Sequence, residues 1–230
     1  MVRRMRTLLH MPLDPPSRMA RLILAEKGLP ARLVETPPWQ ENPALAAANP
    51  ARAVPVLIDE PPTGGEIAVS PVEAIAEYLE EAYRGEKLLP ATSAGRAETR
   101  RLVAWFGKKF EPEVNAAIAR QRIDARLKGR LRYDRESYEA GLEAMRWHLD
   151  YLNWLLEHRG WLAGDKMTVA DLCAAAHLSA NDYVGAVPWT DFPQVKEWYA
   201  RLKCRPSFRS LLADRVESLT PPSHYADLDF

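Results

Sequence analysis

The spacing of apolar positions changes along the chain. Residues 6–11 (RTLLHM) form a short apolar run typical of a buried strand. The stretch SRMARLILAEKGL that follows carries apolar residues at helical spacing and ends at Gly28, a residue favoured at helix C-termini. Residues 31–36 (ARLVET) indicate a second strand. The chain is therefore predicted to begin with a β-α-β unit.

A hairpin and one more helix complete this first unit. The segments AVPVLIDE and GEIAVS have strand character and are joined by the turn sequence PPTGG. Apolar residues from about Val72 to Ala82 then return to helical spacing. We expect these segments to form an α/β, thioredoxin-like domain over residues 1–88.

Beyond RGEKLLPATSAG the strand pattern does not return. Four long segments have helical periodicity, at residues 96–127, 134–158, 169–183 and 192–203. We expect a linker at residues 89–95 and an all-α, all-helical domain at 96–212. The remaining residues, 213–230, contain Pro221-Pro222 and lack helical periodicity, which predicts an extended C-terminal tail.

Charge and cysteine usage exclude some classes of function. The chain has 31 basic and 31 acidic residues among 230, so there is no global bias toward nucleic acid or membrane. Cys173 and Cys204 lie far apart without metal-ligand spacing, which argues against a zinc or dithiol site and favours a reduced, cytoplasmic protein. The basic N-terminus has a short apolar run cut by Pro12, so we expect neither a signal peptide nor a membrane span.

One helix start can be predicted in detail. In WLAGDKMTVADLCAA, Thr168 is placed as an N-cap and Asp171 as the N3 residue of a capping box. Met167 and Leu172 are placed to form the accompanying hydrophobic staple. We interpret this motif as structural.

An α/β unit followed by an all-helical unit resembles the glutathione S-transferase superfamily. The resemblance extends to about residue 212 and includes RAVPVL at 52–57, the WLAGDKMTVADLCAA segment and DFPQVKEWYARLKCRPSF, with its Arg205-Pro206 pair. It implies a glutathione site on the thioredoxin-like domain. It also implies a cis peptide bond before Pro55 and a contact between the Val54 backbone and glutathione. A cis X-Pro bond is uncommon in proteins.

The residues that would hold glutathione are altered. In the superfamily a Glu-Ser pair before the helix that resembles AIAEYL anchors the γ-glutamyl end, but Pro71 and Val72 occupy those positions here. Proline has no N–H and neither side chain is polar. We expect Ser70 instead to be a helix N-cap, with Pro71 at the first helical position and Glu73 at N3.

The group that would stabilise the glutathione thiolate is also in doubt. Asp14 stands where the superfamily usually has a serine, and a carboxylate beside a thiol raises the thiol pKa. Ser17 is the remaining candidate, although its favoured role is to cap a helix that begins at Arg18. The alternative function is therefore a glutathione-dependent transferase or isomerase that uses Ser17, with Val54 and Pro55 contacting the ligand. We expect no metal and no cofactor, since the histidines are scattered and neither GxSxG nor HExxH occurs.

A local excess of positive charge lies between the first two long helices. ARQRIDARLKGRLRYDR contains seven basic and two acidic residues, an excess of five. It is equally consistent with a solvated helix end and with a docking patch for an acidic protein. Nucleic acid is less favoured because interleaved aromatic residues are lacking. The candidate partner-binding residues are Arg120, Arg122, Arg126, Lys128, Arg130 and Arg132.

Two further segments are candidate partner sites. Trp39 lies in the loop sequence ETPPWQENP, where it either packs inward or serves as an interface anchor. The sequence SHYADLDF is typical of a short recognition segment, and its alternative is a segment folded back onto the helical domain. The candidate residues in this tail are Tyr225, Asp227, Leu228, Asp229 and Phe230.

With the altered glutathione site, these segments resemble one branch of the superfamily, the alphaproteobacterial cell-division proteins that bind filaments of the tubulin-like protein FtsZ. That resemblance implies a homodimer without catalytic activity, located in the cytoplasm at the division site. It also implies that the tail connects, directly or indirectly, to cell-wall synthesis during constriction.

Overall fold

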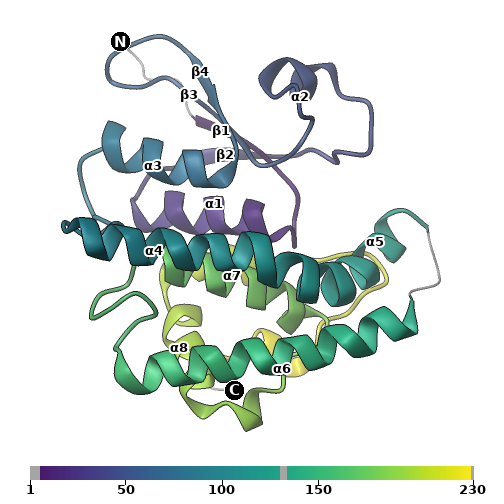
Figure 1. The fold of residues 1–230 in the computed structure, drawn as a ribbon. Coiled ribbons are helices and arrows are strands. Elements are labelled where there is room, and N and C mark those ends of the chain that lie inside the picture. Colours follow the sequence, from purple (N-terminus) through teal and green to yellow (C-terminus); the bar gives the residue numbers. More distant parts are fainter. Residues whose placement is uncertain (1–5, 130–133, 229–230) are drawn as a thin grey trace.

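The computed structural model describes residues 6–129 and 134–228 (Figure 1). Arg130, Arg132, Asp229 and Phe230 lie outside the described residues. The first half contains a four-stranded sheet and three helices, and the second half is helical, which confirms the predicted fold class. No helix in the described ranges combines the length and apolar character needed to span a bilayer.

The sheet has the order β2-β1-β3-β4. Its strands are β1 (Arg6–His10), β2 (Ala31–Glu35), β3 (Val56–Asp59) and β4 (Ile67–Val69). β1 pairs in parallel with β2, and β3 is antiparallel to both β1 and β4, so the predicted β-α-β unit and hairpin are confirmed. The helices α1 (Pro15–Glu26) and α3 (Val72–Ala82) lie between the sheet and the helical half (Figure 1). The short α2 (Pro43–Ala48) was not predicted.

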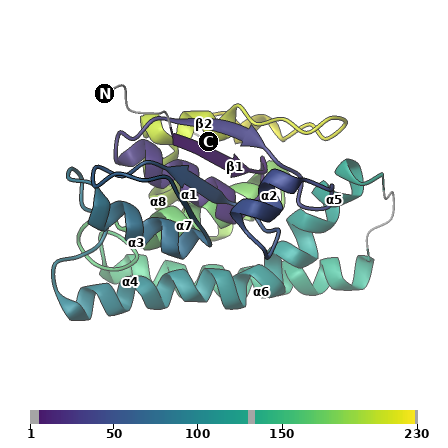
Figure 2. The ribbon, with the colours of Figure 1, turned by 90° about the horizontal axis from the view of Figure 1, so that it is seen from above.

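The helical half begins with a continuous rod. It consists of α4 (Ser93–Trp105), the π-helical segment η1 (Phe106–Arg120) and α5 (Gln121–Leu127). The long α6 (Arg135–His158) runs beside it (Figures 1 and 2). Behind these lie α7 (Val169–Tyr183), α8 (Pro193–Lys203) and α9 (Arg209–Leu212), with short 3-10 turns at Trp189–Asp191, Pro206–Phe208 and Ser223–Tyr225. The predicted long helices are therefore present at nearly the expected positions.

α7 lies at the centre of this half, and every residue in it is buried. Its predicted capping box is confirmed: the Asp171 carboxylate accepts the Thr168 backbone N–H at 2.8 Å, and the Thr168 hydroxyl accepts the Ala170 N–H at 3.2 Å. Asp171 also accepts from Leu162 N–H at 2.9 Å and from Trp198 Nε1 at 3.0 Å. The cap thus joins α7 to the preceding loop and to α8.

Two other predicted helix starts are wrong. Asp14, not Ser17, is the N-cap of α1 and accepts the Ser17 N–H at 3.0 Å. The helix begins earlier than expected because proline is well tolerated at the first helical position, where its missing N–H is not needed. At α3 the N-cap is Pro71, whose extended backbone (φ −74°, ψ −169°) delays the helix to Val72, so Ser70 is not the cap.

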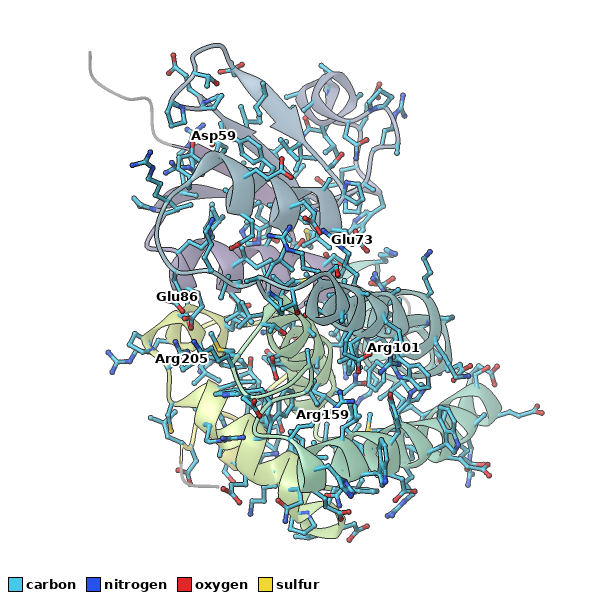
Figure 3. All side chains as sticks on the ribbon, turned by 60° about the vertical axis from the view of Figure 1, so that its left-hand side comes forward. Asp59, Glu73, Glu86, Arg101, Arg159 and Arg205 are labelled. Atoms are coloured by element: carbon cyan, nitrogen blue, oxygen red, sulfur yellow. The ribbon has the colours of Figure 1, made fainter. Side chains whose placement is uncertain are left out.

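α1 is bound tightly to the helical half. The Arg18 guanidinium donates to Ser179 Oγ at 2.7 Å, and Arg21 pairs with Asp214 at 2.9 Å. At the end of α1, Glu26 pairs at 2.6 Å with Arg205, which is labelled in Figure 3. These polar contacts join the two halves across their interface.

The expectation of an extended tail is wrong for the part that the structure describes. The chain after α9 folds back against the helical half (Figure 1), and the Tyr225 ring is fully buried. The Tyr225 hydroxyl accepts from Arg18 at 2.9 Å and donates to the Leu211 carbonyl at 3.0 Å. The buried guanidinium needs acceptors, and the returning chain supplies one, so the alternative interpretation of the tail holds here.

Candidate functional site

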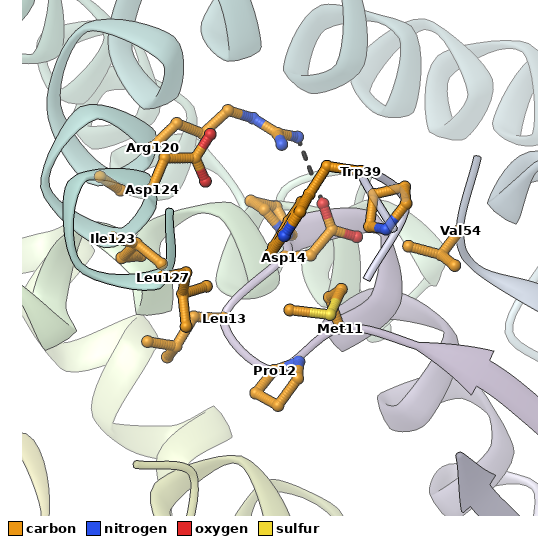
Figure 4. A pocket seen from close by; sticks show the side chains of 13 residues that line it. Met11, Pro12, Leu13, Asp14, Trp39, Val54, Arg120, Ile123, Asp124 and Leu127 are labelled. Carbon is orange, nitrogen blue, oxygen red and sulfur yellow. Dashed lines mark hydrogen bonds and ion pairs between the residues drawn. The ribbon is translucent and has the colours of Figure 1, made fainter. Parts of the chain in front are cut away.

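A small cleft lies where the end of the helical rod meets the first β-α turn and the Trp39 loop (Figure 4). Seen from above, the sheet lies over α1, and α5 stands at the far end of the rod (Figure 2). The polar and aromatic side chains that line the cleft are Asp14, Trp39, Arg120 and Asp124, and the apolar ones include Met11, Leu13, Val54, Ile123 and Leu127.

Ser17 lies beneath this cleft and is fully buried. Its hydroxyl donates to Asp14 Oδ2 at 2.7 Å and accepts the Met11 N–H at 3.2 Å. A hydroxyl has one proton to donate. Because that proton is held by the Asp14 carboxylate, Ser17 has none to offer a thiolate in the cleft.

Arg120 is shared between two carboxylates. Its Nη2 lies 3.3 Å from Asp14 Oδ1 (Figure 4), and its Nε donates to Glu111. Burial raises the pKa of the Asp14 carboxyl, against the opposing charge of Arg120. Burial also acts to raise the pKa of Glu111, but the hydrogen bond with His177 and the charge of Arg120 outweigh it and bring that pKa to about 2.

The charge around the cleft does not favour an anion. Asp124 pairs with Lys128 at 2.6 Å. With Asp14, Glu111 and Arg120, this makes three acidic and two basic side chains at and beneath the cleft. Glutathione has two carboxylates and one amine, so the excess of acidic groups opposes its binding.

Trp39 and Lys128, two residues predicted to bind a partner, are brought together at the rim of the cleft. The Lys128 Nζ lies 4.6 Å from the centre of the Trp39 ring, a cation–π contact, and 40% of Trp39 is exposed. We call this pair the Trp39 rim. It offers an exposed face of tryptophan, a residue type enriched among interface anchors, next to a positive charge.

The predicted basic patch is not one continuous surface. Arg120 points into the cleft, and Arg122 donates to the Val184 carbonyl at 2.7 Å, while Arg126 is exposed. Residues two apart on a helix do not face the same side, so a basic run in the sequence is dispersed around α5. Of the described basic residues in this segment, Arg126, Lys128 and Arg135 are the exposed ones, and Arg135 lies at the start of α6 and not on α5.

The tail residues likewise divide into two groups. Tyr225 is buried and holds the segment in place, whereas Asp227 and Leu228 are exposed. The Leu228 carbonyl lies 3.8 Å from the sulfur of Cys204, the residue that follows α8. The tail therefore has an internal anchor followed by exposed residues.

The positions where the superfamily has its glutathione anchor lie at the start of α3. Val72 is buried in the core, and Pro71 is exposed without a side-chain cap for α3. The peptide bonds before Pro55 and Pro71 are both cis, and only the first was predicted. Val54 is half-buried and lines the cleft, so its backbone position is retained.

Sequence reasoning missed the polar cluster beneath the cleft. Glu111 accepts from Asn115 Nδ2 at 2.7 Å, and Asn115 and His177 are hydrogen-bonded to each other at 2.6 Å. Asn181 also donates to Asn115. The available signal was the set of polar residues at helical spacing within apolar faces, at positions 111, 115, 177 and 181. In the described residues, His, Cys, Asp and Glu side chains form no cluster of three or more suited to a metal ion.

Residues 8–87 match the glutathione S-transferase N-terminal domain, and residues 109–206 match the glutathione S-transferase C-terminal domain. The chain belongs to the glutathione S-transferase family. This family member is 45% identical over 225 residues to FtsZ-localized protein A of Caulobacter vibrioides, covering 98% of both chains. It is also 29% identical to glutathione S-transferase 3 of Zea mays, over 95% of this chain and 98% of that protein.

Solved structures of family members have the same fold as this chain. FzlA from C. crescentus has a TM-score of 0.94 at 44% identity, covering 99% of this chain and 100% of that chain. A glutathione S-transferase from Rhodospirillum rubrum has a TM-score of 0.93 at 46% identity, with 98% and 100% covered. High similarity thus extends to proteins described as transferases as well as to an FtsZ-localized protein, so the choice between these functions rests on the site.

Proposed function

We propose that this glutathione S-transferase family member is a non-catalytic protein that binds FtsZ filaments and promotes constriction during cell division. The similarity to FtsZ-localized protein A over 98% of both chains supports the association with FtsZ. The observation that carries the non-catalytic part is the buried Ser17 hydroxyl, whose proton is held by Asp14 at 2.7 Å.

Two further features support the absence of glutathione chemistry. Pro71 and Val72 offer no polar side chain at the start of α3. The acidic excess at the cleft disfavours a ligand with two carboxylates. A thiolate bound above Asp14 would also meet a carboxylate, which raises rather than lowers its pKa.

The Trp39 rim is the proposed contact with the filament. It is exposed beside the cleft, and Arg126 adds a second exposed charge on α5. The exposed tryptophan suits an interface anchor, and the exposed Arg126 suits an acidic protein surface. Of the other predicted residues, Arg120 and Arg122 make internal contacts with Asp14 and with the Val184 carbonyl, next to this surface. Arg130 and Arg132 are included in the proposed contact on the sequence only.

The tail and the quaternary structure complete the proposal. Asp227 and Leu228, together with Asp229 and Phe230 by sequence, form the proposed link to cell-wall synthesis, with Tyr225 as their internal anchor. The protein acts as a homodimer in the cytoplasm at the division site. A dimer presents two filament-binding surfaces, which raises the effective affinity for a polymer.

Cosedimentation with FtsZ polymerised in the presence of GTP tests the filament contact. We expect the wild-type protein to pellet with filaments, and Trp39→Ala and Lys128→Glu each to weaken binding by about tenfold or more, the usual loss for an interface anchor. Lys166→Glu is the matched control, since Lys166 is exposed in the loop before α7 and should not matter. Unchanged pelleting of both rim variants would remove the Trp39 rim from the proposal.

The competing function is a glutathione-dependent transferase or isomerase, favoured by the retained Val54-Pro55 segment at the cleft. Isothermal titration with reduced glutathione, extended to millimolar ligand, separates the two. We expect no binding heat from the folded protein. Binding, with turnover that is lost in Ser17→Ala, would establish the enzyme instead.

A further inference from the structure

The helical rod contains a long π-helical segment that the proposed function does not use. A π-helix has hydrogen bonds between residues five apart, and it is usually confined to a single turn, often at a functional site. Here it extends over the 15 residues of η1, Phe106–Arg120, and includes Pro112. The segment leads directly into α5 (Figure 1), so its winding sets the rotation of α5 about the axis of the rod.

The winding also decides which side chains of η1 share a face. Glu111 and Arg120 are nine positions apart. In an α-helix, with about 3.6 residues per turn, that separation is about two and a half turns and places the two side chains on opposite faces. In a π-helix, with about 4.4 residues per turn, it is about two turns and places them on the same face. The ion pair between Arg120 Nε and the Glu111 carboxylate therefore depends on the π-helical form.

Arg120 also connects the rod to the first half of the chain. Its Nη2 lies 3.3 Å from Oδ1 of Asp14, the N-cap of α1 (Figure 4). The other carboxylate oxygen of Asp14 is fixed by Ser17, since it accepts the backbone N–H at 3.0 Å and the hydroxyl at 2.7 Å. Arg120 is thus held between one carboxylate of the first half and one of the helical half. We call these three residues, Asp14, Glu111 and Arg120, the Arg120 bridge.

The Trp39 rim is a second connection between the rod and the first half. Lys128, the residue that follows α5, lies about two turns beyond Arg120 along the rod. Its Nζ reaches over the Trp39 ring, 4.6 Å from the ring centre. A different rotation of α5 would turn Lys128 away from Trp39. The cation–π contact therefore depends on the same rotation that the Arg120 bridge holds.

We propose that Asp14, Glu111 and Arg120 are positioning residues for the Trp39 rim. The π-helical winding sets Arg120 between the two carboxylates, and this holds α5 in the rotation that places Lys128 over Trp39. The proposal rests on the proposed function, because the Trp39 rim is the proposed filament contact. Side chains that are ordered before contact lose less conformational entropy on binding. Loss of the bridge should therefore weaken filament binding although no residue of the rim is changed.

Asp14→Asn tests the Arg120 bridge with little change to the fold. Asparagine is as good an N-cap as aspartate and can still accept from Ser17, but it offers no charge to Arg120. In cosedimentation with FtsZ filaments we expect this variant to bind about five- to tenfold more weakly, the usual effect of losing a charged hydrogen bond. Asp191→Asn is the matched control. It breaks an exposed ion pair with Arg146 in the turn before α8 and should bind like the wild type.

A double-mutant cycle with Lys128→Ala separates positioning from a general loss of stability. If Asp14 acts through Lys128, Asp14→Asn should weaken binding by less than about twofold in the Lys128→Ala protein. Equal losses in the two backgrounds would show that the bridge and the rim act independently, and would overturn the proposal.

The indole N–H resonance of Trp39 provides a readout that needs no filament. It is assigned by its absence from the NMR spectrum of Trp39→Phe. We expect it to shift or broaden in Asp14→Asn and to stay unchanged in Asp191→Asn, with native circular dichroism in both. Arg120→Lys keeps the charge but lacks the planar fork that reaches two carboxylates, so it should shift the resonance as well.

An unchanged Trp39 resonance in folded Asp14→Asn and Arg120→Lys would overturn the proposal, even if filament binding fell. A wild-type protein that does not pellet with filaments would instead contradict the proposed function. In that case the Trp39 resonance still decides whether the Arg120 bridge positions the Trp39 rim.

Discussion

Glu111 is the residue on which the polar cluster beneath the cleft converges. Its folded-state pKa is lowered from 4.5 to about 2 because the hydrogen bond with His177 and the charge of Arg120 outweigh burial. A depressed carboxyl pKa contributes stability above the unfolded pKa, and that stability is lost as the pH falls through the folded pKa. The contribution is therefore complete above about pH 4.5 and disappears toward pH 2.

Glu111→Gln should remove this contribution at every pH, because glutamine resembles the protonated acid. We expect the variant to lose up to about 3 kcal/mol of unfolding free energy at pH 7 and about half of that at pH 3, measured by urea denaturation. Glu113→Gln on the same helical segment is the control: Glu113 is 39% exposed and pairs with Lys109, so its loss should stay below about 1 kcal/mol. An equal loss at both pH values would show that Glu111 acts without its charge.

At the scale of elements, the start of α7 connects this helix to the preceding loop and to α8. Asp171 accepts from three buried N–H groups, the backbone N–H of Thr168, the backbone N–H of Leu162 and the indole N–H of Trp198, and also from the Thr168 hydroxyl at 3.1 Å. Asp171→Ala leaves all three without an acceptor, and each costs about 1–3 kcal/mol, so we expect little or no folded protein.

Thr168→Ala removes one cap and should cost about 1 kcal/mol in thermal or urea unfolding. Thr92→Ala, at the N-cap of α4, is the comparison: its hydroxyl accepts the Gly95 N–H at 3.1 Å in an exposed setting and should cost no more. Similar small losses for Asp171→Ala and Thr168→Ala would contradict the role given to the carboxylate.

The helices and strands were largely predictable from the sequence, whereas contacts between distant segments were not. Periodicity was sufficient for the long helices and the hairpin, and the capping box at Thr168 was readable because its partners lie three residues apart. Ser17 and Ser70 were misassigned as caps because a proline next to each shifts the helix start. The sequence alone leaves Tyr225 open between a recognition segment and a segment folded back on the helical domain, because its partner, Arg18, is more than 200 positions away. Contacts between distant segments, such as Asp14 with Arg120, are set by the tertiary fold and leave no local pattern.

At the scale of the whole molecule, α1 lies in the first half of the chain, but its polar side chains contact the second half. Asp214 holds both Arg18 and Arg21, whose side chains are 0% and 5% exposed. Removing one partner from a buried ion pair leaves charges without compensation. This pair of arginines therefore makes Asp214 the residue most able to couple the two halves.

Asp214→Asn should cost about 3–5 kcal/mol and change the pattern of unfolding as well as its midpoint. In the wild type we expect one cooperative urea transition, with backbone amides of Leu8 and Leu57 in the sheet exchanging with solvent no faster than those of α7. In the variant the sheet amides should exchange faster while those of α7 stay protected. Without the ion pairs between α1 and Asp214, the first half can unfold locally while the helical half stays folded. Glu77→Gln, which breaks the exposed pair with Arg100, should leave both sets unchanged. Equal acceleration of sheet and α7 amides in Asp214→Asn would mean that the core of α7, and not the α1 ion pairs, holds the two halves together.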